Sequence, residues 1–266
     1  MQDHFGAARA LIARAPFRVV ALARSADGET LFAHEPDRAV PAASVIKVPL
    51  VMALYADAAD GLIDLTERVA TGDRVDGSGI LRDMPDVAAL SLRDLAAAMM
   101  ILSDNTATNR VIERLGVDRV AARMAEWGIA NTALKRKMYD FEAAKRGLEN
   151  VATASELAAL LARLVAGECR DRATSDAVLA IMARCEDDRK LRRFLAPNAR
   201  VPSKSGTLDA SRNDVAVFAG PSRTVIVAVF TSEVTDTLAA EHLLGIIGRG
   251  AAMAAGMSVP PLPFGD

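Results

Sequence analysis

Strand-forming segments lie near both ends of the chain, and a long helical stretch separates them. Residues 17–23 and 29–34 are rich in β-branched and apolar side chains and flank the turn-forming residues 25–28, which predicts a β-hairpin. Residues 201–231 contain three further segments of this kind with turn residues between them, which predicts an antiparallel meander. Because neither group of strands can bury its faces alone, we expect the two groups to share one sheet.

The predicted fold class is therefore α+β with two lobes: an antiparallel sheet built from the N- and C-terminal segments and flanked by helices, and an inserted all-helical lobe. We expect residues 1–61 and 196–266 to form the discontinuous α/β lobe and residues 62–195 to form the helical lobe. A site between two such lobes is the default expectation for a protein of this architecture.

Capping patterns mark two helix starts in the middle of the chain. Ser91 and Asp94 match a capping box, and Thr153 and Glu156 match another, each followed by an apolar helical pattern. The charged segment Asp187–Phe194 is predicted to be an exposed helix.

Composition excludes several classes of function. A formal charge of −2 and the lack of a basic run argue against a nucleic-acid partner. Two cysteines, Cys169 and Cys185, and three scattered histidines have no metal-ligand spacing, and whether the cysteines pair is left open. We expect no metal and no cofactor. The predicted partner is a small-molecule substrate, and the protein is predicted to be a monomer.

Targeting signals are also absent from the sequence pattern. No apolar run approaches the length of about 20 residues that a membrane-spanning helix needs, and the first residues suggest an amphipathic helix. We therefore expect no membrane partner. The predicted location is the cytoplasm if the sequence is complete, and the periplasm or the exterior if a leader was removed.

A serine and a lysine three residues apart open an apolar helical run at Ser44 and Lys47. Three residues make just under one helical turn, so both side chains are expected on one face. A lysine can take the proton of a serine hydroxyl only when burial or nearby cations lower its pKa. The alternative is a capping serine followed by a surface lysine.

Two further polar motifs follow in the chain. The first, Ser103-Asp104-Asn105, separates two apolar helices, where it could equally be a solvated turn. The second, Lys204-Ser205-Gly206-Thr207, lies in a predicted strand. A serine, two lysines and a second hydroxyl around one cleft would suit acyl transfer on an amide that carries a carboxylate.

These three motifs, in this order, resemble those of the active-site serine penicillin-recognising enzymes, and most closely the class A β-lactamases. The resemblance covers most of the chain. It implies that Ser44 is the acylated nucleophile, that Lys47 is its proton partner, and that Ser103 relays a proton to the leaving nitrogen.

The same resemblance implies a substrate-binding set. Asn105 would hold the amide side chain of the substrate, Lys204 would supply positive charge and Ser205 would donate to the substrate carboxylate. The backbone amides of Ser44 and Thr207 would form the oxyanion hole. Gly206 would let the acyl ligand lie close to the strand, because it has no Cβ.

The chain departs from the family in the loop that follows the helical insert. Class A enzymes carry a Glu-x-x-x-Asn pattern there, whose glutamate activates the water that releases the acyl group, and residues 136–150 contain no such pattern. If the family's loop arginine matches Arg136, the glutamate position falls on Met138. Asp140, Glu142 or Glu149 could supply the carboxylate in a rearranged loop, with Glu142 preferred, and an exposed helical glutamate is the alternative.

Arg212 is a candidate for a second cation that binds the substrate carboxylate, and a cross-strand ion pair is the alternative. The leading functional hypothesis is a class A-type serine β-lactamase that forms an acyl-enzyme at Ser44 and releases it slowly. The alternatives are a D-Ala-D-Ala peptidase or esterase of the same fold, and a non-catalytic ligand-binding homologue.

Overall fold

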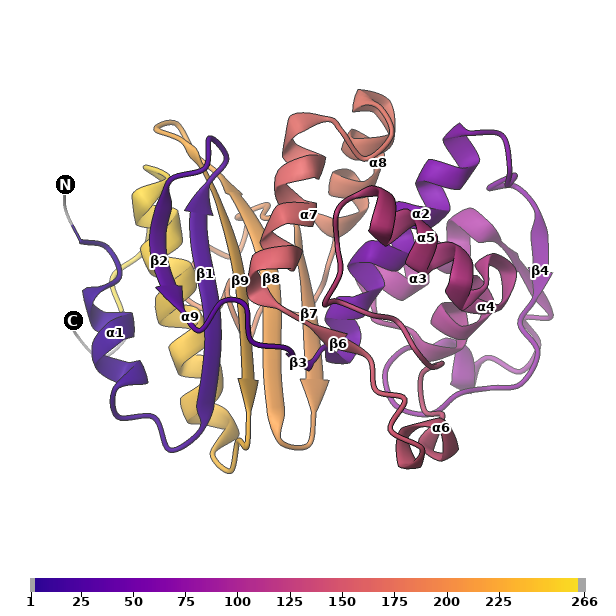
Figure 1. Ribbon diagram of the computed structural model, residues 1–266, viewed down its shortest axis with the longest axis horizontal. Coiled ribbons are helices and arrows are strands. Elements are labelled where there is room, and N and C mark those ends of the chain that lie inside the picture. Colours follow the sequence, from indigo (N-terminus) through magenta and orange to yellow (C-terminus); the bar gives the residue numbers. More distant parts are fainter. Residues whose placement is uncertain (1–2, 263–266) are drawn as a thin grey trace.

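A computed structural model describes residues 3–262 and places a five-stranded antiparallel sheet between two sets of helices (Figure 1). The strands of this sheet are β1 (Arg18–Ser25), β2 (Thr30–His34), β7 (Ser203–Leu208), β8 (Ser211–Ala219) and β9 (Thr224–Ser232). Their spatial order is β2-β1-β9-β8-β7, so the N-terminal hairpin joins the C-terminal meander through the β1–β9 pair. This confirms the α+β expectation.

The helices follow the predicted order along the chain. They are α1 (Gly6–Ile12), α2 (Lys47–Ala59), α3 (Leu92–Ile101), α4 (Asn105–Leu115), α5 (Val117–Glu126), α6 (Phe141–Lys145), α7 (Ala154–Ala166), α8 (Arg172–Met182) and α9 (Thr237–Ala254), with the 3-10 turns η1 (Ala43–Ile46) and η2 (Leu81–Asp83). Short strand pairs join β3 (Val40–Pro41) to β6 (Val151–Ala152) and β4 (Arg68–Ala70) to β5 (Ala89–Ser91).

Both faces of the sheet are covered, which explains why its central strands are almost entirely apolar. Along β9, Val225, Val227 and Val229 pack toward α9, whereas Ile226 and Phe230 pack toward α7 and α2. The side-chain period of two in a strand thus divides one sequence between two hydrophobic cores. In Figure 1, α1 and α9 lie on one side of the sheet, and α7 with the remaining helices lies on the other.

The edge strand β7 and the start of α2 meet where the sheet adjoins the helices. Strand β7 contacts η1 directly, and α2 continues from η1 into the middle of the helices, where it packs against α3, α4, α5 and α8. Helix α2 is apolar on nearly every side and is buried along most of its length. The sheet edge and this helix therefore hold the polar motifs at one place.

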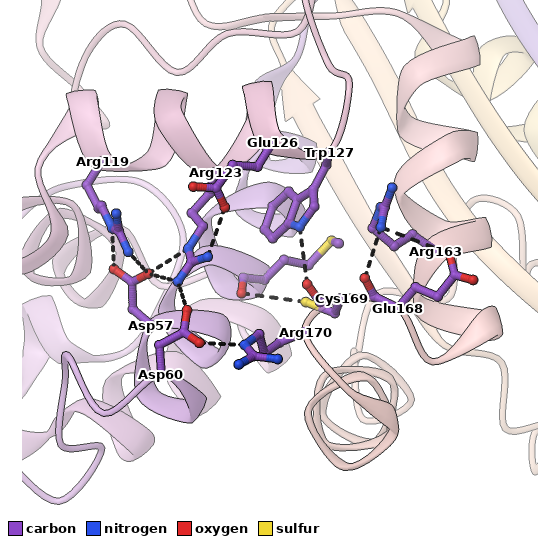
Figure 2. A network of polar contacts seen from close by, with 11 residues as sticks. Asp57, Asp60, Arg119, Arg123, Glu126, Trp127, Arg163, Glu168, Cys169 and Arg170 are labelled. Atoms are coloured by element: carbon purple, nitrogen blue, oxygen red, sulfur yellow. Dashed lines mark hydrogen bonds and ion pairs between the residues drawn. The ribbon is translucent and has the colours of Figure 1, made fainter.

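An ion-pair network fixes the far end of α2 to its neighbours (Figure 2). Asp57 accepts hydrogen bonds from Arg119 and Arg123 of α5 at distances of 2.7 to 2.8 Å. Asp60 pairs with Arg123 and with Arg170, which lies just before α8. The network therefore joins three segments that are distant in sequence.

One predicted capping box forms only in part. The Thr153 hydroxyl accepts from Glu156 N, as predicted, but the Glu156 carboxylate does not return to the backbone of Thr153. It accepts instead from the backbone amides of Ala130, Asn131 and Thr132. These three donors in an adjacent loop outcompete the single amide of the box. At Ser91 the cap forms as predicted, and Asp94 N donates to the Ser91 hydroxyl.

The predicted exposed helix over Asp187–Phe194 is wrong. The segment is a series of turns, and within it Lys190 and Leu191 have no exposed surface. The Lys190 ammonium group donates a hydrogen bond to the Asp187 carboxylate, and this contact allows the Lys190 side chain to lie in the interior. Local charge alone could not reveal this burial.

Within residues 3–262, none of the helices combines the length and the apolar character needed to cross a bilayer.

Candidate active site

Ser44 lies in the 3-10 turn η1, one turn before the α-helix that begins at Lys47. The preceding residue, Ala43, has a φ of 49°, a conformation that costs energy for any residue with a Cβ. Non-glycine residues in such conformations cluster at functional sites. The turn therefore presents Ser44 at the entrance to α2 instead of within a regular helix.

Lys47 is completely buried, and its ammonium group lies among oxygen atoms of the second motif. Its Nζ is 2.7 Å from Ser103 O, 3.0 Å from Ser103 Oγ and 3.1 Å from Asn105 Oδ1. A neutral amine could donate its two protons to the two carbonyl-type oxygens and accept a proton from the Ser103 hydroxyl. The structure thus brings the first and second motifs together.

The pKa of Lys47 is lowered well below its usual value, first by burial and then by the positive charge of Lys204. Asp104 opposes this shift. Because a base must be unprotonated to accept a proton, the lowered pKa makes Lys47 suited to that role near neutral pH.

The second motif is a strained turn held by Asp104. Ser103 has a φ of 57°, which allows both its carbonyl and its hydroxyl oxygen to face Lys47. The buried Asp104 carboxylate accepts hydrogen bonds from Ala107 N, where it caps α4, and from Ile80 N and Leu81 N. Asp104 therefore binds the 76–81 loop to the start of α4.

The amide of Asn105 is held on both sides. Its Oδ1 accepts from Lys47 Nζ at 3.1 Å, and its Nδ2 donates to Asp76 O at 2.8 Å. One proton of the Nδ2 group remains for a ligand.

Lys204 links the third motif to the second. It is fully buried, and its Nζ donates to Ser103 Oγ at 3.2 Å and to Ser205 O at 2.8 Å. Ser103 Oγ therefore lies between the amines of Lys47 and Lys204. Burial lowers the pKa of Lys204 as well, although nearby acidic groups oppose part of this shift.

A cavity of about 260 Å³ opens over these groups. Ser44, Ser103, Lys204, Ser205 and Thr207 line it, together with Ser78, Ile101, Leu102, Cys185, Glu186, Asp187 and Arg189. At least one residue from each of the three motifs thus lines this cavity, whereas Lys47, Asn105 and Gly206 are not among its lining residues.

Gly206 lets strand β7 lie against the serine turn. A Cβ at this position would be 2.9 Å from Ala43 Cβ, 3.1 Å from Ser44 N and 3.2 Å from Ala42 O. The sequence had suggested that this glycine makes room for a ligand. The contacts show that it makes room first for the backbone of the turn that carries Ser44.

The carboxylates of the 136–150 loop do not line this cavity. Glu142 lies on α6 with a side chain that is 75% exposed, and it pairs with Lys145. Asp140 caps α6 by accepting from Ala143 N, and Glu149 pairs with Arg136. The structure therefore does not bring the predicted Glu142 to Ser44.

Met138, the position expected for the family's glutamate if Arg136 matches its loop arginine, is held from both sides by Asn109 of α4. Met138 N donates to Asn109 Oδ1 at 2.8 Å, and Asn109 Nδ2 donates to Met138 O at 3.0 Å. Within that loop, Tyr139 has a φ of 61°. Sequence reasoning missed Asn109, because a buried asparagine within a helix has no sequence signature that separates it from a surface residue.

Arg212 is held outside the cavity, since its guanidinium lies 3.4 Å from Glu241 and donates to the carbonyls of Leu208 and Ser211. This is an ion pair, the alternative that the sequence had left open, although its partner lies on α9. The arginine that lines the cavity is Arg189, which also donates to Asp187 at 3.1 Å. The wrong helical assignment of its segment hid Arg189 from sequence reasoning.

The two cysteines are both buried and both free. Burial raises the pKa of the Cys169 thiol to about 12, which makes it unreactive. Among the described residues, no group of three or more His, Cys, Asp or Glu side chains is arranged to hold a metal ion.

Comparison with known proteins gives a consistent result. The family model described as "Beta-lactamase enzyme family" matches residues 7–254. A β-lactamase from Sphaerobacter thermophilus is 33% identical, with a TM-score of 0.88 over 96% of this chain and 99% of that one. No match was found among curated proteins.

Two further solved structures have the same fold. An ancestral class A β-lactamase designated GNCA is 27% identical, with a TM-score of 0.84 over 95% of this chain and 100% of that one. A leucine-to-glutamate mutant of PBP-A, described as an acyl-enzyme complex with penicillin G, is 24% identical, with a TM-score of 0.84 over 95% of this chain and 96% of that one. The extent of the family match and the identity to the Sphaerobacter enzyme show that this chain belongs to the β-lactamase enzyme family.

Proposed function

We propose that this protein is a serine hydrolase of the class A type, in which Ser44 attacks the carbonyl of a β-lactam or a related amide and forms an acyl-enzyme. The observation that carries the proposal is the hydrogen-bonded series Lys47–Ser103–Lys204 beside the cavity that Ser44 lines. Solvated turns with no shared function would not place two buried lysines on one hydroxyl group.

In the proposed reaction, Lys47 accepts the proton of Ser44 as the serine oxygen bonds to the carbonyl carbon. The C–N bond then breaks, and Ser103, which receives a proton from Lys47, gives one to the leaving nitrogen. The contact of 3.0 Å between Lys47 Nζ and Ser103 Oγ supports this transfer. The backbone amides of Ser44 and Thr207 would stabilise the negative oxygen.

We assign recognition of the substrate carboxylate to Ser205, Lys204 and Arg189, in place of the Arg212 expected from the sequence. Arg189 lines the cavity together with Ser205, whereas Arg212 pairs with Glu241. An arginine that faces solvent can rotate toward a carboxylate and bind it with two hydrogen bonds.

We further propose that release of the acyl group is slow. Each of the three loop carboxylates is occupied elsewhere, by Lys145, by Arg136 or by the cap of α6. No such group therefore stands ready to activate a water molecule. This supports the second candidate, a D-Ala-D-Ala peptidase or esterase that β-lactams inhibit.

Intact-protein mass spectrometry with penicillin G tests acylation. Ring opening expels no fragment, so we expect the mass to rise by one whole penicillin molecule, and we expect Ser44→Ala to show no increase. Ser222→Ala, on an exposed turn far along the chain, is the matched control and should be acylated normally. A wild-type protein without an adduct, or an adduct that persists in Ser44→Ala, would contradict the proposal.

The same measurement with a D-Ala-D-Ala peptide or a small ester distinguishes the candidates. Turnover of the peptide or ester, together with a lasting penicillin adduct, would identify the peptidase or esterase. Recovery of every ligand unchanged would identify a non-catalytic binding protein.

A further inference from the structure

Buried charged side chains surround the edge strand β7 and are not used by the proposed reaction. Lys190 and Asp214 have no exposed surface, and the Asp187 side chain is only 18% exposed. Lys204, which lies on β7 itself, is equally buried. These three fully buried groups and the largely buried Asp187 must balance one another, because an unpaired buried charge is very unfavourable.

Asp214 is the least satisfied member of this cluster. Its Oδ2 accepts from Leu191 N at 3.1 Å, whereas its Oδ1 has no hydrogen-bond partner among residues 3–262. On β8 it lies opposite Ser205 of β7 and Val229 of β9, neither of which carries a charge. A carboxyl group kept in this position at a cost to stability needs an explanation.

The charged groups around Asp214 come from every neighbouring element. Lys190 and Asp187 lie in the turns that precede β7, and Lys204 lies on β7. On α9, Glu241 faces the same end of β8 and is paired with Arg193 and Arg212. Burial raises the pKa of Asp214 to about 7, while Lys190 and, more weakly, Lys204 oppose the rise.

Asp214 and Lys204 act on each other through their electric fields. In the β7–β8 register Lys204 pairs with Val215, and Ser205 pairs with Asp214. Lys204 and Asp214 are therefore one position apart on neighbouring strands, and their side chains leave opposite faces of the sheet. Charges separated by low-dielectric protein interact much more strongly than charges in water. Burial lowers the pKa of Lys204 most and Lys190 adds to this shift, whereas Cys185, Asp214 and Asp187 raise the pKa.

We propose that Asp214 is a positioning residue that keeps Lys204 protonated, and that Lys204 in turn keeps Lys47 in its neutral, proton-accepting form. The structural basis is the buried cluster of Lys190, Asp187 and Asp214 around the strand that carries Lys204. Asp214 acts only through Lys204, because it does not line the cavity.

The charge of Asp214 affects Lys204 first and Lys47 second. When Asp214 is ionised, Lys204 retains its proton and can bind the substrate carboxylate. The positive charge of Lys204 lowers the pKa of Lys47. Loss of the Asp214 charge should therefore weaken Lys204 as a cation and leave Lys47 more readily protonated once Lys204 has become neutral.

The direct test is titration of Lys204 by NMR in protein labelled with 13C-lysine. The chain has six lysines, so the Cε signal can be assigned by its absence in Lys204→Arg. We expect Asp214→Asn to lower the pKa of Lys204, so that its proton dissociation constant rises by about threefold or more. In the wild type, the same signal should also respond near pH 7, as Asp214 ionises.

Asp57→Asn is the matched control, because it removes a different buried carboxylate, which is ion-paired and lies at the far end of α2. It should leave the Lys204 titration unchanged. Asp214→Glu restores the charge and should restore the titration even if it packs poorly. If Asp214→Asn does not fold, Asp214→Ser and the wild-type response near pH 7 still decide the question.

Acylation by penicillin G gives the second readout, and only this part rests on the proposed function. We expect the alkaline limb of the acylation rate to move to lower pH in Asp214→Asn and to stay in place in Asp57→Asn. An unchanged Lys204 titration in Asp214→Asn would overturn the inference. A wild-type protein that is never acylated would overturn the proposed function and leave the lysine titration as an independent test.

Discussion

Lys47 can serve as a base only while its amine is uncharged, and the structure supplies two causes for that state. The amine has no contact with solvent, and the charge of Lys204 disfavours a second positive charge nearby. A surface lysine in the same Ser-x-x-Lys pattern would remain protonated and would be inert as a base. Burial therefore decides between the two meanings of the motif.

Replacing Lys47 by Met should lower the rate of acylation at neutral pH by about 100-fold or more, because the general base is lost while an apolar side chain of similar length fills the space. Stopped-flow or quenched mass spectrometry with penicillin G measures the rate. In the wild type, the rate should fall on acidification through the lowered pKa of Lys47. A Lys47→Met protein that is folded by circular dichroism and acylates normally would show that another group is the base.

Met138 is the residue at which a single substitution could change the fate of the acyl group. Its backbone is fixed by Asn109 on both sides, so a new side chain there should start from a defined position. We expect Met138→Glu to shorten the lifetime of the penicillin adduct by at least about tenfold, since a carboxylate could then activate water. The adduct mass is followed against time after excess penicillin is removed.

Met138→Gln is the control for this change, because glutamine has nearly the same shape but cannot act as a base. The adduct should persist in Met138→Gln as in the wild type. Equal lifetimes in the glutamate and glutamine variants would mean that this position does not reach the acyl group.

At the scale of elements, α2 is held at both ends by polar contacts, which at its far end are ion pairs. Lys47 contacts Ser103 and Asn105 at its start, and Asp57 with Asp60 binds α5 and Arg170 at its end (Figure 2). Hydrogen bonds that Arg170 and Arg123 donate lower the pKa of Asp60 to about 2. The helix that begins at Lys47 is thereby fixed along its axis.

Asp57→Asn should destabilise the protein by about 3 kcal/mol, because Arg119 and the largely buried Arg123 lose a shared carboxylate. Urea unfolding at neutral pH measures this change. Glu126→Gln, which removes a half-exposed partner of the same Arg123, should cost less than about 1 kcal/mol. Equal losses in the two variants would mean that burial does not set the strength of this network.

Elements were predicted well where one local signal controls them. The helix signals around Ser91 and Thr153 and the meander over residues 201–231 rest on caps and on alternating apolar residues, and the structure confirms them. The segment Asp187–Phe194 was misjudged, because its high charge suggested exposure. Lys190 is buried there only because Asp187 and a distant strand surround it.

At the scale of the whole molecule, Asp214 makes stability depend on pH. Its pKa is 3.8 in an unstructured chain and about 7 in the folded protein. Between these pH values the folded protein holds a proton that the unfolded chain has released. The unfolding free energy of the wild type should therefore fall as the pH rises through this range.

We therefore expect the unfolding free energy of Asp214→Asn, relative to wild type, to increase from about pH 4 to about pH 8, by at most about 4 kcal/mol. Urea unfolding at several pH values measures this difference. Asp57, whose pKa is lowered, should behave in the opposite way, and the cost of Asp57→Asn should shrink as the pH falls below about 4. A pH-independent difference for Asp214→Asn would mean that Asp214 is ionised throughout this range.

The sequence by itself determined the order of strands and helices, the caps and the three motifs, because periodicity and capping act over a few neighbouring residues. The tertiary structure alone decided which polar groups are buried and which charges meet. Arg212 pairs with Glu241, Glu142 stays in solvent, and Arg189 lines the cavity, because segments distant in sequence set each environment. A side chain's pKa depends on that environment, so the chemistry of Lys47 and Lys204 follows from the fold.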